Sequence, residues 1–407
     1  MSARSSELAV VGAGAAGLFA ALFAARGGVR TLLLETRPQP GAKIRVSGGG
    51  RCNVLPSVAE LADFHTHGSR NSLRNLLFSW PLAEVRAFFE RDLEIALVVE
   101  PTGKVFPASN DPREIVGALL AKCAEAGVEL VCGFRVVGLR RSADGFELTS
   151  EDGRSVSAAR VVLATGGLSL PKTGSDGGGL QMARELGHAL VATHPALVPL
   201  LAADERWGTL AGIALPVELT VRHGDKPLEQ RTGDFLFTHK GFSGPVVLDL
   251  SHHFTCPERE RPRLFARFGG AVDWDAALVG GGAATAAVVL RKDVPRRLAA
   301  LLLERAGVDA ETRCAELTRA SRLALVRELS DCELTLRGDE GYRTAEVTDG
   351  GIALADVEPR ALESRRVPGL FFAGEMLDAT GRIGGYNFLW AFVTGRKVGQ
   401  GIAAAAR

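Results

Sequence analysis

The sequence of 407 residues predicts an α/β fold, in which a parallel sheet carries an antiparallel meander and a β-rich domain is inserted. Three observations predict it. The apolar segment Leu8–Val11 runs into G-x-G-x-x-G at residues 12–17, the next apolar segment ends at Glu35, and Leu370–Gly374 repeats the pattern of an apolar strand ending in glycine. A strand, a glycine-rich turn, a helix and an acidic residue at this spacing are typical of a Rossmann-like dinucleotide-binding domain.

Each residue of this fingerprint has a physical role. Gly12 permits the tight turn, Gly14 lets the backbone approach a pyrophosphate, and Gly17 lets helix and strand pack closely. The N–H groups at the start of the helix face the phosphates. Glu35, 18 residues after Gly17, is placed to bind a ribose. The contacts predicted in this region are Gly12, Gly14, Ala15, Ala16, Gly17, Glu35 and Thr36.

An alternative for the first segment is a membrane span or the apolar part of a signal peptide, because Leu8–Ala25 carries no charge. Against both, the glycines stand at fingerprint spacing, and Glu7 precedes the run where a signal peptide needs basic residues. The net charge of +1 gives no reason to expect nucleic acid or an acidic membrane as a partner. The six cysteines form no C-x-x-C pair, so we expect free thiols and a cytoplasmic protein.

The first domain is predicted to continue with a helix over residues 14–26, a strand over 31–35, a long loop over 38–57 and a helical stretch at about 69–91. The next helix starts at Asp111-Pro-Arg-Glu, because Asp is a good N-cap, Pro suits the first turn and Glu follows three residues later. Gly127 ends this helix.

A strand over residues 128–132 follows, and then residues 134–158 alternate between apolar and polar. Asp-Gly turns at 144–145 and 152–153 divide them into a three-stranded antiparallel meander. The meander leads into the buried strand 160–164, and residues 387–405 are predicted to form a closing helix.

The domain organisation follows from the return of the first pattern near the C-terminus. Residues 1–194 and 351–407 are predicted to form one discontinuous domain, and residues 195–350 an inserted β-rich domain. Within the insert, strands are expected at 215–222, 234–238, 245–250, 332–337 and 343–348. A helical block is expected at about 292–331.

Three further glycine-rich segments favour noncovalent FAD over NAD, because an extended flavin cofactor must be held far from the first fingerprint. Each follows a predicted strand; they are residues 47–53, 165–177 and 374–387. A dehydrogenase that binds only NAD leaves two of them unexplained. No second G-x-G-x-x-G is present, so NAD(P)H is expected only as a transient donor. The further predicted FAD contacts are Lys43, Ser47, Gly48, Gly49, Gly50, Arg51, Cys52, Asn53, Val136, Thr165, Gly166, Gly167, Asp176, Gly374, Glu375, Asp378, Gly385, Tyr386 and Asn387.

The same segments resemble the BaiN-like (YhiN-like) flavoprotein family. The resemblance rests on residues 41–53, 103–107, 237–245, 368–378 and 384–387, and it covers essentially the whole chain. It implies a two-layered FAD-binding domain, an inserted β-barrel-like domain with helices, and an oxidoreductase. One branch of the family reduces conjugated C=C bonds in oxo-bile acids. Leu55-Pro56 and Trp390–Gly395 depart from the family pattern, which puts the substrate in doubt more than the cofactor.

Four residues are candidates for chemistry near the flavin. Arg51 is a candidate cation for flavin or substrate oxygen, or else a surface charge. His239 is a candidate acid or base, or else a strand-end histidine with a backbone partner. Tyr386 either donates a proton or packs, and Cys52 is either a redox thiol or a small packed residue. No H-x-x-x-H motif or Cys/His cluster suggests a metal.

We therefore expect an FAD-dependent oxidoreductase that reduces an activated C=C bond or oxidises a small organic molecule, with hydride exchange at flavin N5. The expected partner is a small-molecule substrate, with neither nucleic acid nor membrane. A flavin-binding protein without catalysis, or one associated with RNA modification, is the alternative.

Overall fold

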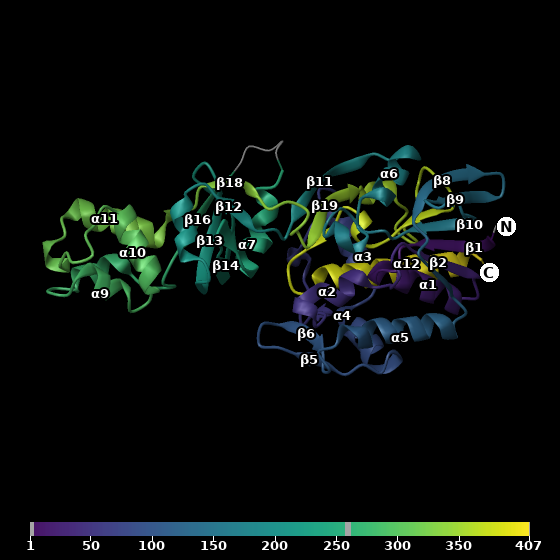
Figure 1. Cartoon of the computed structure of the whole chain (residues 1–407), viewed down its shortest axis with the longest axis horizontal. Coiled ribbons are helices and arrows are strands. Elements are labelled where there is room, and N and C mark those ends of the chain that lie inside the picture. Colours follow the sequence, from purple (N-terminus) through teal and green to yellow (C-terminus); the bar gives the residue numbers. More distant parts are fainter. Residues whose placement is uncertain (1–3, 257–261, 407) are drawn as a thin grey trace. The chain divides into compact units, whose positions relative to one another are not determined.

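The computed structural model describes residues 4–256 and 262–406, which form two compact units. Unit 1 contains the described residues up to Pro195 and those from Glu346 onwards, and unit 2 is Ala196–Ala345. Each unit has its own hydrophobic core. Figure 1 labels many of the elements of both units.

The main sheet of unit 1 has the strand order β7-β2-β1-β10-β9-β8, and β20 pairs with β10 as well. β1 (Arg4–Val11), β2 (Thr31–Glu35), β7 (Glu129–Cys132) and β20 (Leu370–Phe372) run parallel to their partners. β8 (Val136–Ser142), β9 (Gly145–Ser150) and the start of β10 (Ser155–Leu163) form the antiparallel meander. The α/β fold with a parallel sheet and a meander is thus confirmed.

β10 joins the meander to the parallel sheet as one continuous strand. Residues 155–158 pair antiparallel with β9, and residues 156–163 pair parallel with β1. Its last three residues, Val161–Leu163, pair with β20 from the far end of the sequence. Both termini of the sequence therefore contribute to a single domain.

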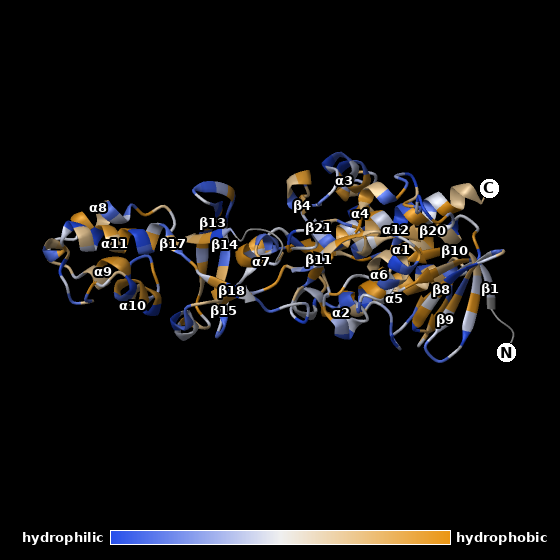
Figure 2. Cartoon of the chain, turned by 90° about the horizontal axis from the view of Figure 1, so that it is seen from above, coloured by the Kyte–Doolittle hydropathy of each residue, from blue (hydrophilic) through white to orange (hydrophobic). Residues whose placement is uncertain are grey.

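Two helices pack tightly beside the parallel strands. α1 (Ala15–Arg26) and α12 (Tyr386–Ala405) lie against each other, and both show mainly apolar residues in Figure 2. Glycines at 395 and 399 permit the close approach, because a Cβ at either position would overlap backbone carbonyl oxygens of α1. The apolar run Leu8–Ala25 is thereby divided between a strand and a buried helix of unit 1. No helix in the described part of the chain is long and apolar enough to cross a bilayer.

Two predictions for residues 38–91 were wrong in detail. Instead of a continuous loop, α2 (Ala42–Gly50) forms after Gly41, with a break at Ser47, where ψ is 156°. The predicted helical stretch 69–91 divides into α3 (Arg70–Leu77), α4 (Leu82–Ala87) and a π-helical turn, η2 (Phe88–Asp92). Pro81 separates the first two, because the residue before a proline is disfavoured in helical conformation.

The remaining elements of unit 1 include short strands and two helices. β3 (Leu55–Pro56), β6 (Lys104–Pro107) and β5 (Leu97–Val99) form a small antiparallel sheet, and α5 is Pro112–Glu125. α6 (Gly178–Glu185) follows β10. Two further pairs form: β4 (Phe64–His65) with β21 (Thr380–Gly381), and β11 (Leu190–Ala196) with β19 (Val347–Ile352).

Unit 2 is built on a seven-stranded sheet of order β17-β16-β13-β14-β15-β12-β18. The strands are β12 (Leu200–Ala202), β13 (Ala214–His223), β14 (Lys226–Phe237), β15 (Gly241–Ser243), β16 (Arg263–Arg267), β17 (Cys332–Glu333) and β18 (Leu336–Asp339). The two edge strands, β17 and β18, are separated in sequence by only Leu334 and Thr335. The sheet therefore curls like a barrel.

The rest of unit 2 is helical. α8 (Trp274–Val279), α9 (Ala286–Leu290), α10 (Arg296–Arg305) and α11 (Arg319–Ser330) share its core. The predicted strand 245–250 was wrong, because Pro245–Leu250 is helix α7. Pro245 occupies the first helical turn after Gly244, whose φ is 93°. For so short an apolar run, periodicity does not separate a buried strand from a buried helix.

Candidate active site

The turn after β1 has the geometry that dinucleotide binding requires. A Cβ at Gly17 would overlap the carbonyl oxygen of Gly12, so Gly17 allows α1 to pack on the strand. Gly12 has φ +100° and donates its N–H to the Leu34 carbonyl at 2.8 Å. By contrast, a Cβ at Gly14 would meet no protein atom within 4 Å. The backbone at the start of α1 therefore faces open space, into which the N–H groups of Ala15 and Ala16 can bind phosphate.

Glu35 lies at the end of β2 and is 8% exposed. Its two carboxylate oxygens accept hydrogen bonds from the backbone N–H groups of Ala13 and Arg37, both at 2.8 Å. Burial raises the pKa of Glu35, and these hydrogen bonds act in the opposite direction. The carboxylate is thus held beside the fingerprint turn, followed by the half-buried Thr36.

The segment at residues 47–53 takes a backbone path that glycine makes possible. Gly48, Gly49 and Gly50 all have positive φ, at 57°, 69° and 81°. A Cβ at Gly49 or Gly50 would meet nothing within 4 Å, whereas one at Gly48 would lie 2.7 Å from the backbone nitrogen of Asn53. The segment therefore presents a backbone free of side chains, as a second part of an extended ligand requires.

Arg51 contacts two side chains of unit 1, and the neighbouring Cys52 is a buried thiol. The Arg51 guanidinium lies 4.1 Å from the centre of the Phe106 ring and forms an ion pair of 2.7 Å with Glu100. Cys52 is 1% exposed, and burial raises the pKa of its thiol to about 12, opposed by a hydrogen bond with Ser47. All six cysteines are free. At neutral pH Cys52 is thus a protonated thiol packed inside unit 1.

Asn53 connects this segment with the one that starts α12. With its amide oriented to satisfy its neighbours, Asn53 accepts the N–H of Gly385 at 3.3 Å and donates to the Leu55 and Val105 carbonyls. A Cβ at Gly385 would lie 2.5 Å from the carbonyl carbon of Leu55. The structure therefore brings together two glycine-rich segments that are about 330 residues apart in sequence.

A partly buried ion pair, between Lys43 and Glu375, binds Ser169 of the glycine-rich segment at residues 165–177. The Lys43 ammonium lies 2.6 Å from the Glu375 carboxylate and 2.7 Å from the Ser169 hydroxyl. Ser169 and the backbone N–H of Thr348 also donate to Glu375, at 2.6 and 2.9 Å. Burial by itself raises the pKa of Glu375, but Lys43 and these donors outweigh it, and the net shift is downward.

Other predicted contact residues lie around this network. A Cβ at Gly166 or Gly167 would overlap the side chain of Ser175 or Thr348, so these glycines permit close packing. Thr165 lies against Met376, at 3.3 Å from its sulfur. Asp176 accepts a hydrogen bond from Arg135 at 2.7 Å and precedes α6, and Val136 is buried at the start of β8.

The residues around the start of α12 have mainly structural contacts. The Trp390 indole donates to the Gly374 carbonyl at 3.1 Å, and Asn387 exchanges two hydrogen bonds of 2.8 Å with the backbone of Gly381. The Tyr386 ring lies edge-on to Phe64, with centroids 5.7 Å apart. Asp378 is fully buried. Burial raises its pKa, opposed by His67 and Thr66.

His239 belongs to unit 2, in the turn between β14 and β15, and it is exposed. A Cβ at Gly208 would lie 2.8 Å from the carbonyl oxygen of His239. This turn therefore packs closely on the segment before β13. These contacts are local to unit 2, and the role of His239 in chemistry stays a prediction.

Sequence reasoning missed several polar residues of unit 1. Ser169 and Thr348 surround Glu375, and His67 forms an ion pair of 2.8 Å with Asp349. Burial raises the pKa of Asp349, but the charges and hydrogen bonds of His67, His65 and Thr380 outweigh this effect, so the pKa lies well below its usual range. The signals available in the sequence were the His-Thr-His spacing at residues 65–67 and the Asp-Gly-Gly at 349–351.

Taken together, the residues present fit an extended dinucleotide. Gly14, Gly49 and Gly50 are open on their Cβ side, Glu35 lies beside the first turn, and Lys43 with Glu375 joins the segments at 41–53, 165–177 and 374–387. A flavin bound along these segments would gain backbone donors for its phosphates and charged groups of both signs.

Comparison with known proteins identifies similar proteins over the whole length. The family described as "HI0933-like protein Rossmann domain" matches residues 6–401. The ribosomal RNA dihydrouridine synthase of Escherichia coli (strain K12) is 32% identical over 405 residues, covering 97% of this chain and 98% of that protein. The 3-dehydro-bile acid delta(4,6)-reductase of Clostridium scindens is 31% identical over 414 residues, covering 99% of this chain and 100% of that protein.

A solved structure shows the same fold. The open conformation of a flavocytochrome c3 fumarate reductase has a TM-score of 0.50 at 18% identity, with 99% of this chain and 79% of that chain covered.

Proposed function

The chain belongs to the HI0933-like family, and from this premise we propose that it is a flavin-dependent reductase of a C=C bond conjugated with a carbonyl group. The family resemblance and the class of FAD-dependent oxidoreductase expected from the sequence are confirmed. The proposal goes further, to the reaction type and the substrate.

One observation carries the proposal: two relatives with different substrates share one type of bond. The name of the Clostridium scindens relative specifies a 3-oxo bile acid reduced at its 4,6 double bonds. The name of the Escherichia coli relative specifies dihydrouridine, which is uridine with a saturated C5–C6 bond. In both substrates the C=C bond is conjugated with a carbonyl. A chain similar to both at 31–32% identity over its whole length is expected to have kept that chemistry.

The described residues supply binding and orientation for such a reaction. The start of α1, at Gly14, Ala15 and Ala16, would hold the pyrophosphate of FAD, and Glu35 would bind the ribose of its AMP part. When bound, the flavin supplies the hydride. Lys43 is held by Glu375 and Ser169, which fixes its ammonium as a hydrogen-bond donor at one place in the site. NAD(P)H, bound transiently, is a candidate electron donor.

We propose a small conjugated ketone as the first substrate candidate. The net charge of +1 supports it, because proteins that bind RNA usually carry a basic stripe. The second candidate is a uracil base in ribosomal RNA, and the name of the Escherichia coli relative favours it. Identity does not separate the two, at 31% and 32%.

The deciding experiment uses the reduced holoprotein under anaerobic conditions. It is mixed with a steroid 4-en-3-one, with uridine, and with ribosomal RNA, and flavin reoxidation is followed by stopped flow. The product is checked by mass spectrometry for the gain of two hydrogens. Turnover of the steroid alone supports the first candidate, and turnover of RNA alone supports the second. If no conjugated carbonyl compound reoxidises the flavin faster than buffer does, the proposed chemistry is wrong.

We propose Arg51, His239 and Tyr386 as the candidates for contact with substrate. His239→Ala is expected to slow flavin reoxidation by substrate while FAD stays bound. An unchanged rate would leave His239 as a residue of the β14–β15 turn. The six free cysteines fit a reducing compartment, which supports a cytoplasmic location.

A further inference from the structure

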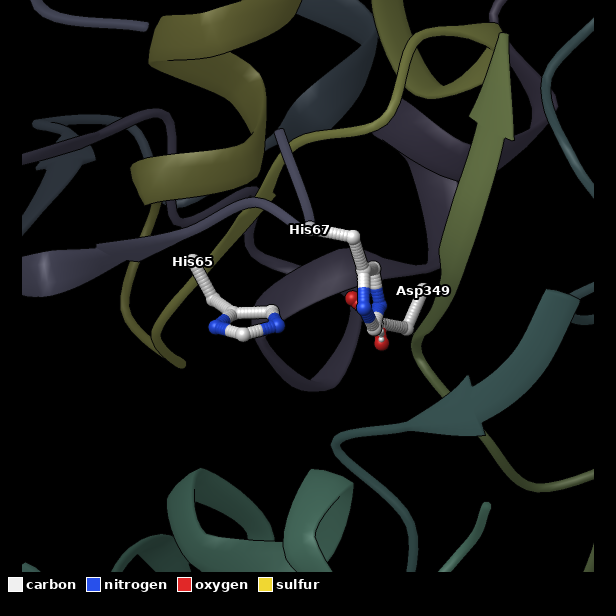
Figure 3. A group of neighbouring side chains, drawn as sticks. All are labelled: His65, His67 and Asp349. Atoms are coloured by element: carbon white, nitrogen blue, oxygen red, sulfur yellow. Dashed lines mark hydrogen bonds and ion pairs between the residues drawn. The ribbon is translucent and has the colours of Figure 1, made fainter. Parts of the chain in front are cut away.

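Two histidines and one aspartate converge in unit 1, outside the contacts predicted for the flavin. His65 ends β4, His67 follows two residues later, and Asp349 lies in β19. One nitrogen from each histidine and one carboxylate oxygen all lie within 4.8 Å of one another. Figure 3 shows both imidazole rings and the carboxylate gathered at one place.

This arrangement is held from several sides. Thr380 of β21 pairs with His65 in the β4–β21 ladder, and its hydroxyl donates to Asp349 Oδ1 at 2.8 Å. Asp378 accepts the Thr66 hydroxyl at 3.0 Å and the His67 backbone N–H at 3.1 Å. Thr380 therefore holds the Asp349 carboxylate, and β21 and Asp378 hold the segment that carries both histidines; surrounding hydrogen bonds of this kind usually position the ligands of metal sites.

The charge around the cluster also favours a cation. Asp349 is 3% exposed and Asp378 is fully buried, and both contact the same three-residue segment, 65–67. Buried carboxylates need compensating positive charge, because they lose the hydration that stabilises them in water.

The donor set indicates which cation. Two imidazole nitrogens and one carboxylate oxygen suit zinc and its neighbours among the divalent transition metals, whereas calcium and magnesium prefer oxygen ligands alone. We propose that His65, His67 and Asp349 bind one divalent transition-metal ion, with zinc as the expected occupant. Three protein ligands leave a fourth position for water or another small ligand.

Binding requires the three ligand atoms, which lie within 4.8 Å of one another, to adjust their positions. His67 Nε2 and Asp349 Oδ2 are 2.8 Å apart, which is a hydrogen-bond distance. The ligand atoms of a tetrahedral zinc site lie about 3.4 Å apart, given bonds of about 2.0–2.1 Å. The ion would therefore replace the proton between these two atoms and separate them by roughly half an ångström.

A second cluster, Glu229, His252 and His253 in unit 2, is a matched control. Both carboxylates have a partner on each oxygen, but Glu229 Oε1 is bound by the Arg231 guanidinium, whereas Asp349 Oδ1 is bound by the Thr380 hydroxyl. The adjacent guanidinium also repels a cation. We expect no metal there.

The test measures metal in the purified FAD-loaded protein. After chelator treatment and dialysis, the protein is titrated with Zn²⁺ and, separately, with Co²⁺, whose absorption bands are read at wavelengths longer than those of the flavin. We expect one ion per chain, and a melting temperature that rises when the ion is added. His67→Ala and Asp349→Asn should abolish binding, and Thr380→Val should weaken it about 10–100-fold. Glu229→Gln and His253→Ala should bind as the wild type does.

The FAD content of each variant shows whether unit 1 has folded, and the wild-type stoichiometry decides the matter if a variant fails to fold. Wild-type protein that takes up no Zn²⁺ or Co²⁺ at micromolar concentration overturns the proposal and leaves an ion pair between His67 and Asp349. The same conclusion follows if the ion is lost in the Glu229 and His253 variants but kept in those of His67 and Asp349.

Discussion

Replacement of Glu35 by alanine should weaken FAD binding without unfolding unit 1. The carboxylate already accepts two backbone N–H groups, from Ala13 and Arg37, each at 2.8 Å. An ionised carboxylate has about four lone-pair positions, so two remain for the hydroxyls of a ribose.

The magnitude follows from the charge of the acceptor. A hydrogen bond to a charged group contributes about 1.5–3 kcal/mol. At about 1.4 kcal/mol per factor of ten, Glu35→Ala should raise the Kd for FAD roughly 10–150-fold. Glu35→Gln keeps an acceptor but loses the charge, and it should fall between the wild type and Glu35→Ala.

The assay titrates apoprotein with FAD and follows the quenching of flavin fluorescence, with thermal melting of the ligand-free protein as a check of folding. Glu7→Ala is the matched control, because Glu7 accepts the Arg30 N–H at 2.8 Å where the pairing of β1 with β2 begins, whereas Glu35 lies where β2 ends. That variant should bind FAD as the wild type does. A folded Glu35→Ala protein whose Kd stays within twofold of wild type would remove Glu35 from the site.

Three further predictions use other residues. Gly14→Ala should fold but bind FAD at least tenfold more weakly, whereas Gly17→Ala should lose both the fold and the flavin. The reason is that a methyl group at residue 17 would overlap protein backbone, whereas one at residue 14 would not. Equal melting temperatures and equal flavin contents of the two variants would contradict this. Cys52 has a pKa of about 12 and is 1% exposed, so at pH 8 it should react with iodoacetamide at least about a hundredfold more slowly than the half-buried Cys256. Peptide mass spectrometry measures the labelling of each cysteine, and comparable labelling of the two would refute the burial of Cys52. Lys43→Met should destabilise unit 1 by about 2–4 kcal/mol at pH 7, since it leaves a largely buried carboxylate unpaired. The pKa of Glu375 is lowered in the folded protein, so the ionised carboxylate contributes its full share of the free energy of unfolding above its ordinary pKa of 4.5, and this share is lost as the pH falls below that value. Denaturant melts should therefore show that the loss of stability in Lys43→Met becomes smaller in acid. A loss of stability that does not depend on pH would contradict the pairing of Lys43 with Glu375.

The parts of this protein that depend on neighbouring residues could be predicted from the sequence alone. A strand, three glycines at fixed spacing and a helix form one local unit, because Gly12 turns the chain with a positive φ and Gly17 packs against the Gly12 carbonyl oxygen. The same holds for the meander, whose Asp-Gly turns reverse the chain at 144–145 and 152–153. The α/β fold class and the cofactor class followed from such units.

Contacts between side chains that are distant in sequence became known only from the folded structure. Lys43 and Glu375 are 332 residues apart in sequence, and His67 and Asp349 are 282 apart. Nothing in the spacing of either pair predicts a contact; for His67 and Asp349, the long-range packing of β4, β19 and β21 creates it. The helix at 245–250 likewise depends on its surroundings in the folded protein. A short apolar run is compatible with strand or helix, and the surroundings that bury it select between them.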